Sequence, residues 1–348
     1  MSKAAQLAAL VGSGQAQGNK NLIINGSMQI SQRGDTTGIT NANSGYYGPD
    51  RYKFNEDGTM TAVVSIAQEA LTSGNAFNDG HLYAYKLSVT TADTAVASDI
   101  YTRITHRFEK DTLALLRKGS SSAKRVTLSF WVKATVTGTN VVEFFDQVNS
   151  RQVGATYTIS SSNTWEYKTV TFPADTSGAL GSGNGLAAEI NFVLQAGSNY
   201  TSGTLDTSWA SETTANRAAG HNSNHFSSTS NTFHFTAVQF EIGDVATAFE
   251  HEDIGTTLAK CQRYYEECRV YALAYHYNDA THADDHTGAC VNYSSTKRAT
   301  PTIAYADTGG SLMTGLTFTN NDHNGTGFYK VGSFGSGARA FISASAEL

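Results

Sequence analysis

The chain has 348 residues, enough for one large or two medium-sized domains. Only 16% of them are charged, the net charge is −6 and no Lys/Arg run is present, so direct binding of DNA or RNA is not expected. No stretch of about 18 apolar residues is present, so no membrane-spanning helix is predicted. With 32 Gly and only 3 Pro, the composition favours short strands joined by tight turns.

Residues 2–11 predict a short helix that Ser2 caps and Gly12 ends. Its apolar face holds Ala4, Leu7, Ala8 and Val11. A helix this short is not stable alone in water, so it must pack on sister copies, another protein or its own domain. The glycine-rich residues 12–20 predict a flexible linker.

From residue 21 to about 252 the hydrophobic period is two, as in β-strands. The clearest run places Val126, Leu128, Phe130 and Val132 on one face and Thr127, Ser129, Trp131 and Lys133 on the other. One buried and one wetter face per strand indicates an antiparallel β-sandwich, and the strand spacing fits a jelly roll. Trp131 and Trp165 lie inside strand patterns and are predicted to be packing residues.

Residues 196–232 form a long Ser/Thr/Asn/Gly segment without periodicity. Loops of this length in a compact domain are functional or disordered in most proteins. One interpretation is a binding or subunit-clasping loop. The other interpretation is a surface loop without a binding role, which Trp209 holds against the domain by packing.

Residues 254–270 change to helical spacing, with Leu258, Cys261, Tyr265 and Cys268 on one stripe. Short strand-like runs follow at 302–305, 316–319, 328–331 and 340–344. We therefore expect an anchor helix and linker at 1–20, a β-sandwich at 21–253, and a connecting helix with a small C-terminal β-module at 254–348. The module is thin for a separate β-domain, and oligomerisation would compensate for its small core.

The three cysteines, Cys261, Cys268 and Cys290, are an odd number without a close pair, which argues against a disulfide scaffold. On the predicted helix, Cys261 and Cys268 would be about 10 Å apart along the axis, too far to bridge. Free thiols in a protein that folds in a reducing cytoplasm are the expectation.

No catalytic or phosphate-binding motif is present, and the chain is predicted not to be an enzyme. The densest polar cluster, residues 276–286, offers His276, His282 and His286 as weak metal-ligand candidates. Such an exposed run is usually solvated, so no metal site is predicted unless several chains meet there.

Carbohydrate recognition needs aromatic rings for stacking beside planar hydrogen-bonding groups. Residues of these types lie near a predicted turn and in the long loop. The glycan-binding candidates are Tyr46, Tyr47, Arg51, Tyr200 and Trp209.

Several segments together resemble those of a recurrent family of bacteriophage virion appendage proteins, the tail fibres and tail-fibre-like proteins. The segments at 21–30 (Asn-Leu-Ile-Ile-Asn-Gly-Ser-Met-Gln-Ile), 125–133 and 164–172 are similar to landmarks of carbohydrate-binding-module jelly rolls, as is 238–243 (Val-Gln-Phe-Glu-Ile-Gly). Residues 298–303 (Arg-Ala-Thr-Pro-Thr-Ile) are similar to the start of the family's small C-terminal β-modules.

The resemblance implies a structural virion protein, a trimeric tail fibre or fibre-like appendage that attaches to the host surface. Its partners would be its own copies, other virion proteins docked through the N-terminal helix, and a host-surface glycan; its location would be the virion, assembled in the host cytoplasm. A capsid or tail decoration without receptor role, and a glycan-binding module of a soluble protein, remain alternatives. A depolymerase is a third, although the long β-helix repeats typical of that class are absent.

No cofactor is predicted. The resemblance implies a structural calcium ion near the first and last strands of the jelly roll. The position of its usual acidic ligand falls near Gln29, which is neutral and therefore argues against calcium.

We expect the purified chain to be a homotrimer, because its short N-terminal helix and thin C-terminal module both need partners. Light scattering at micromolar concentration measures this directly. A stable monomer would contradict the prediction.

Overall fold

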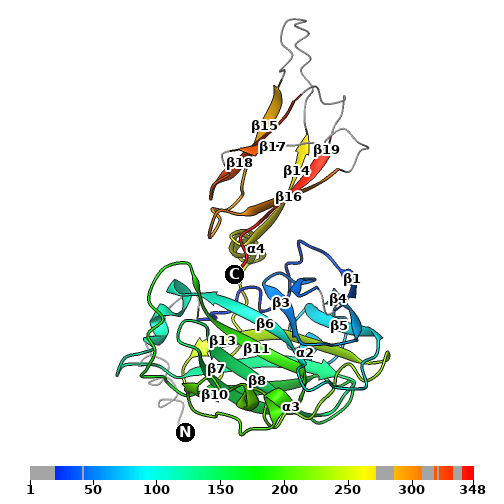
Figure 1. Cartoon of the computed structure of the whole chain (residues 1–348), viewed down its shortest axis with the longest axis vertical. Coiled ribbons are helices and arrows are strands. Elements are labelled where there is room, and N and C mark those ends of the chain that lie inside the picture. The colour runs from blue at the N-terminus through cyan, green and yellow to red at the C-terminus, as the bar shows by residue number, and fades with distance from the viewer. Residues whose placement is uncertain (1–19, 41–42, 272–285, 308–316, 320, 332–338) are drawn as a thin grey trace, which may run out of the picture. The chain divides into compact units, whose positions relative to one another are not determined.

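The computed structural model describes residues 20–40, 43–271, 286–307, 317–319, 321–331 and 339–348. The chain divides into two compact units, the first ending at Glu252 and the second running from Asp253 to Leu348 (Figure 1). The N-terminal face Ala4, Leu7, Ala8 and Val11 lies outside the described residues, as do His276 and His282. Among the described helices, none is long and apolar enough to cross a membrane.

The first unit is an antiparallel β-sandwich of two sheets, as the period of two predicts (Figure 1). The six-stranded sheet has the order β1 (Thr36–Ile39), β4 (Val63–Ala70), β5 (Tyr83–Thr91), β13 (Thr232–Ile242), β7 (Val126–Ala134), β10 (Glu166–Phe172). The seven-stranded sheet has the order β12 (Ala210–Ser211), β9 (Arg151–Ile159), β8 (Gly138–Asp146), β11 (Leu186–Ala196), β6 (Tyr101–Glu109), β3 (Tyr52–Asp57), β2 (Gly45–Tyr46). Short helices in the connections are α2 (Asn75–Asn78), α3 (Ser198–Thr201) and two 3₁₀ turns, Asp111–Leu116 and Thr214–Asn216.

The core lies between the two sheets and consists of their inward-facing apolar residues. Phe130 of β7 shows the packing: its ring is fully buried and meets Tyr157 and Phe192 of the opposite sheet edge-on, each at 5.1 Å between centroids. Such edge-to-face pairs stabilise a core beyond the area that they bury.

The segment 21–29, which resembles a landmark of carbohydrate-binding-module jelly rolls, forms turns and no strand. Its polar groups bind the last strand of the sandwich: Leu22 N donates to Phe240 O at 2.8 Å, and Val238 N donates to Gly26 O at 2.9 Å. The Asn21 amide donates to Val238 O and accepts from Phe240 N, both at 3.0 Å. We call this contact of residues 21–26 with residues 238–240 the N-terminal clasp.

The second unit contains α4 (Ile254–Gln262) and two three-stranded sheets. One sheet has the order β14 (Tyr265–Tyr271), β19 (Arg339–Ser345), β16 (Thr302–Asp307), and the other β15 (His286–Asn292), β18 (Gly325–Val331), β17 (Thr317–Thr319). A buried ion pair at 2.8 Å joins Lys297 to Glu266.

The predicted helix over 254–270 is wrong in its second half. Asp253 caps α4 by accepting from Gly255 N and Thr256 N, and the helix ends at Gln262. Tyr265 and Cys268 belong to β14, which pairs in full register with β19. The run Tyr-Tyr-Glu-Glu-Cys-Arg-Val-Tyr has the aromatic and β-branched residues of a strand, and tertiary pairing overrides the helical spacing.

The long loop at 196–232 packs onto the sandwich, in agreement with the second interpretation of its role. Trp209 contacts the core, with its ring 5.0 Å from that of Phe144, and its indole N–H donates to Pro173 O at 2.9 Å. The ammonium of Lys118 lies 4.6 Å from the Trp209 ring centroid. Trp209 thus packs on the core and its indole N–H already has a protein acceptor; its role in glycan binding stays a prediction.

We expect Phe130→Ala to lower the free energy of unfolding by about 3–5 kcal/mol, because it leaves a cavity in the core. Trp209→Ala should also destabilise the fold, by less, since its ring is only partly buried. Denaturant unfolding of both variants measures the two effects. A Trp209→Ala protein as stable as the wild type would show that the loop is not held by this contact.

Candidate functional site

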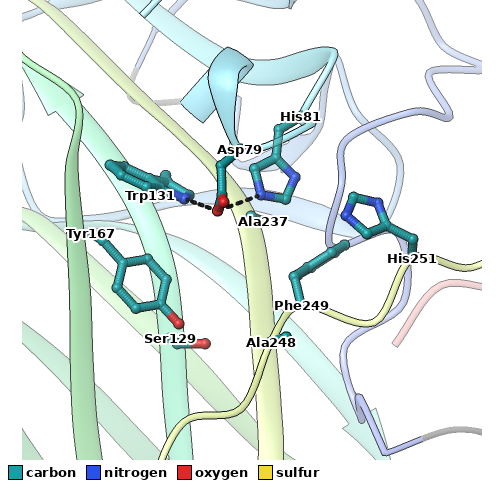
Figure 2. Close-up of a pocket in the computed structure, with 9 residues that line it drawn as sticks. All are labelled: Asp79, His81, Ser129, Trp131, Tyr167, Ala237, Ala248, Phe249 and His251. Carbon is teal, nitrogen blue, oxygen red and sulfur yellow. Dashed lines mark hydrogen bonds and ion pairs between the residues drawn. The ribbon is translucent and has the colours of Figure 1, made fainter. Parts of the chain in front are cut away.

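A pocket of about 330 Å³ lies on the outer face of the six-stranded sheet, over β7, β10 and β13 (Figure 2). The strands supply its floor. The loop around α2 and the segment after β13 supply its walls. Its lining residues are Asp79, His81, Ser129, Trp131, Tyr167, Ala237, Ala248, Phe249 and His251.

A β-bulge shapes the floor of the pocket. The pairing of β13 with β7 shifts register between Thr236 and Gln239, and Ala237 in the bulge has φ 53°. A left-handed conformation at a non-glycine residue costs about 1–3 kcal/mol and persists only where the surroundings impose it. Here the N-terminal clasp holds the next residue, Val238, through both its N–H and its carbonyl. Bulges of this kind redirect side chains and are frequent beside functional sites.

Two aromatic rings stand side by side on the floor. Trp131 of β7 is directly opposite Tyr167 of β10, and their ring centroids are 5.4 Å apart. Tyr167 is 44% exposed, so its ring is accessible to a ligand. Figure 2 shows the indole N–H of Trp131 directed at Asp79, to whose Oδ2 it donates at 3.1 Å.

Asp79, the residue that follows α2, contributes a carboxylate to the pocket. Its side chain is 62% exposed, and its Oδ2 lies 3.6 Å from Nε2 of the buried His81. Burial, and then the neighbouring His251, lower the pKa of His81. His81 is therefore neutral at pH 7.

The second wall is the segment that follows β13. His251 stacks on His81 at 5.4 Å between ring centroids, and Phe249 meets both rings edge-on at 5.1 Å. The clasp also fixes this wall: Asn21 N donates to the Glu250 carboxylate at 2.8 Å, and Glu250 N donates to Gln239 Oε1 at 2.8 Å. The residues that close the sandwich thus also hold the pocket together.

The residues beside the clasp do not fit a calcium ion. Glu241 accepts hydrogen bonds from Gln239 Nε2 at 2.8 Å, Thr247 N at 2.8 Å and Thr247 Oγ1 at 2.7 Å. The Lys20 ammonium donates to Thr247 Oγ1 at 2.6 Å and to Ala248 O at 2.5 Å. These oxygens already serve protein donors, and calcium needs six or more oxygen ligands. Within the described ranges, no group of three or more His, Cys, Asp or Glu side chains could hold a metal ion.

None of the glycan-binding candidates from the sequence lines this pocket. Arg51 is fully buried and donates to Arg107 O at 3.0 Å, so it is not accessible to a glycan. Tyr47 is partly buried and donates to Asn43 O at 2.7 Å. Tyr46 belongs to β2 of the other sheet. Tyr200 belongs to α3, and its ring stacks on that of Tyr101 in β6 at 4.6 Å between centroids.

Sequence analysis missed the pocket residues, although one signal was present. The alternation in β7 assigns Phe130 to the core and Trp131 to the wetter face, where an aromatic residue is unexpected. Trp131 packs against the small cluster of Leu71, Ala76, Ala84 and Trp165, as predicted, but it also lines the pocket, which the prediction did not include. No local pattern connects His81 with His251, because only the fold brings these two segments together.

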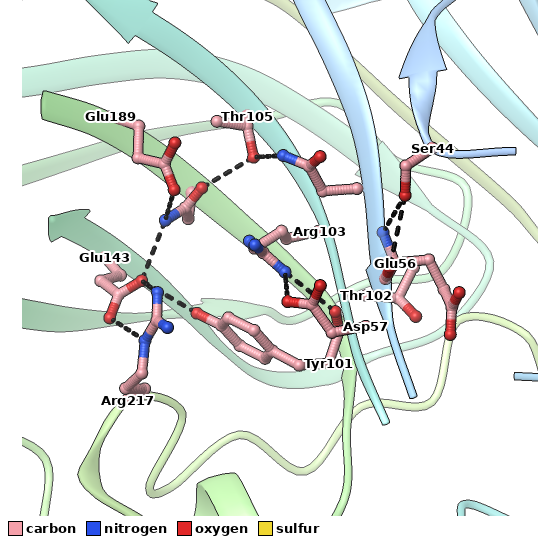
Figure 3. A network of polar contacts seen from close by, with 12 residues as sticks. Ser44, Glu56, Asp57, Tyr101, Thr102, Arg103, Thr105, Glu143, Glu189 and Arg217 are labelled. Carbon is pink, nitrogen blue, oxygen red and sulfur yellow. Dashed lines mark hydrogen bonds and ion pairs between the residues drawn. The ribbon is translucent and has the colours of Figure 1, made fainter. Parts of the chain in front are cut away.

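The outer face of the seven-stranded sheet carries a buried polar network under the long loop (Figure 3). Arg217 of the loop binds Glu143 through two hydrogen bonds of 2.8 Å, and Tyr101 donates to the same carboxylate at 3.0 Å. Asn191 donates to Glu143 at 2.9 Å and to Glu189 at 3.3 Å.

These two neighbouring carboxylates are not arranged as a glycosidase pair. Both side chains are 1% exposed, Glu143 is paired with Arg217, and Glu189 is paired with Arg107 at 3.1 Å. Burial disfavours the charged form of Arg217, but the adjacent Glu143 carboxylate outweighs burial and raises the pKa of the guanidinium above its usual value. Hydrolysis needs two carboxyl groups that flank an accessible sugar bond.

No family model matches this chain, and no curated protein does. Among solved structures, this chain is similar to a putative sugar binding protein from Bacteroides thetaiotaomicron (14% identity, 64% of this chain and 100% of that one, TM-score 0.35). It is also similar to the family 11 carbohydrate-binding module of a Clostridium thermocellum cellulase (14% identity, 63% and 98%, TM-score 0.29). The enzymatically active domain of bacteriophage CBA120 tailspike protein 4 matches at 14% identity over 60% of this chain, which spans 21% of the tailspike chain (TM-score 0.31). Similarities this distant do not decide a function.

Proposed function

We propose that the protein binds a neutral carbohydrate in the pocket of Trp131 and Tyr167, without cleaving it. One observation carries the proposal: two partly exposed aromatic rings lie side by side next to a carboxylate that is already oriented by hydrogen bonding. Aromatic rings bind the apolar C–H face of a pyranose, and a fixed carboxylate accepts hydrogen bonds from its hydroxyl groups.

The charges in the pocket favour a neutral sugar. Asp79 Oδ2 is engaged by Trp131, which leaves Oδ1 to accept from sugar hydroxyls. His81 is uncharged at neutral pH, so the carboxylate is the nearest charge and would repel an anionic sugar. A single carboxylate in the pocket also supports binding without hydrolysis, since glycosidases use two.

We further propose that this binding serves a bacteriophage particle, as a trimeric fibre or fibre-like appendage that attaches to host-surface glycan. The resemblance of the segments at 21–30, 238–243 and 298–303 supports this role. A capsid or tail decoration would share the fold but lack glycan binding, and a soluble glycan-binding module would bind sugar without joining a particle. If the chain is found in purified bacteriophage particles, the soluble glycan-binding module is excluded, and the fibre and the decoration remain.

Trp131→Ala should weaken binding of a neutral oligosaccharide at least tenfold, about 1.4 kcal/mol, because it removes the stacking surface and the donor to Asp79. Isothermal titration with cellohexaose, laminarihexaose and mannohexaose measures this, and melting temperatures confirm that the variant is folded. Tyr167→Phe is the matched control, since it keeps the ring.

Tyr167→Phe should bind within a few-fold of the wild type, and Tyr167→Ala should bind much less tightly. If the wild type binds none of a broad panel of neutral glycans, or if Trp131→Ala binds them as well as the wild type, the pocket is not a carbohydrate site.

A further inference from the structure

A second cluster of recognition-type side chains lies on the other sheet, on the outer face of β2, β3 and β6. Lys53 of β3 is directly opposite Tyr46 of β2 on one side and Thr105 of β6 on the other. Arg103 and Arg107 are two residues from Thr105 in each direction and therefore face the same way. We call Tyr46, Lys53, Arg103 and Arg107 the cationic patch.

The two arginines of the cationic patch already have anionic partners. Arg103 pairs with Asp57 at 2.7 Å, and Arg107 pairs with the buried Glu189 at 3.1 Å. The Thr105 hydroxyl accepts a hydrogen bond from Asn55 Nδ2 at 2.8 Å and donates one to Asn191 Oδ1 at 2.7 Å. The local charges of these two pairs thus cancel.

Lys53 is the exception. It is half-buried, yet within the described part of the chain its ammonium makes no hydrogen bond or ion pair. Burial, and next the charge of Arg107, lower its pKa, and Glu189 and Asp57 only partly offset this effect. No protein group thus neutralises the Lys53 ammonium by direct contact, and an anion placed against it would gain an unopposed electrostatic attraction.

We propose that the cationic patch binds an acidic sugar, with the carboxylate against Lys53 and the ring beside Tyr46. The guanidinium of Arg33 lies 5.3 Å from the Tyr46 ring centroid and orients that ring. One surplus positive charge between two neutral ion pairs fits a ligand with one negative charge per sugar, rather than a polyphosphate.

This site is independent of the aromatic pocket. The pocket is on the outer face of the six-stranded sheet and the cationic patch is on the outer face of the seven-stranded sheet, so the core separates them. The two sites also differ in charge preference, since Asp79 faces the first and Lys53 the second. Each can therefore be tested without affecting the other.

The experiment compares trigalacturonate with its fully methyl-esterified form, which has the same sugar rings without the charge. Titration calorimetry at 50 mM and 500 mM NaCl should show binding of the acidic form alone, weaker at the higher salt concentration. Lys53→Met should lower the affinity at least tenfold, and Lys53→Arg should retain most of it. Because Lys53 has no partner to lose, Lys53→Met should melt no lower than the wild type, which verifies that it is folded.

Trp131→Ala provides the control for the first site and should bind trigalacturonate as the wild type does. Equal affinity for the acid and its ester, or unchanged affinity of Lys53→Met, would overturn the proposal. Complete displacement of trigalacturonate by an equal concentration of inorganic phosphate would also overturn it, because the patch would then bind any small anion.

Discussion

The contact between residues 21–26 and the last strand β13 is the constraint on which the rest of the first unit depends. Gly26 lies so close to β13 that a Cβ atom there would be 2.2 Å from Val238 O, a distance that no side chain permits. This contact closes the sandwich across more than 200 residues of chain. It also holds the bulge at Ala237, and through Asn21 and Gln239 it holds the pocket wall at Glu250. The same contacts thus close the sandwich and support the pocket.

The two outer faces of the sandwich are used differently. The six-stranded sheet leaves an aromatic floor open to solvent, where Tyr167 is 44% exposed. The seven-stranded sheet has charged residues outside, and the long loop covers part of them by pairing Arg217 with Glu143. Leaving either of these buried charges without the other would cost several kcal/mol, so the loop stays closed over that face. Lys53 lies on the same sheet without such a partner, and this is why it suits an external anion.

Period-two patterning was sufficient to predict the sandwich, because burial of one face forces alternation in strands such as β7 and β11. It could not predict the helix end at Gln262, where pairing of Tyr265 with β19 overrides helical spacing. The pocket could not be predicted from the sequence for a different reason: its residues Asp79, Trp131 and His251 come from three segments that are distant along the chain. Among the pocket residues, Trp131 could be suspected from the sequence, because the alternation in its strand places it on the solvent-facing side. Arg51 has the planar hydrogen-bonding group that a sugar site needs, but its complete burial cannot be inferred from the sequence.

The most direct test of this account is a comparison of Gly26→Ala with Gly185→Ala, measured as unfolding free energy and as neutral-glycan binding. A Cβ atom at Gly185 would have its nearest contact at 3.7 Å, at the end of the Lys110 side chain, so that variant should match the wild type in both measurements. Gly26→Ala should lose at least about 2 kcal/mol of stability and, at a temperature where it is still folded, bind glycan more weakly. A Gly26→Ala protein with wild-type stability and binding would contradict the claim that the N-terminal clasp organises both the fold and the pocket.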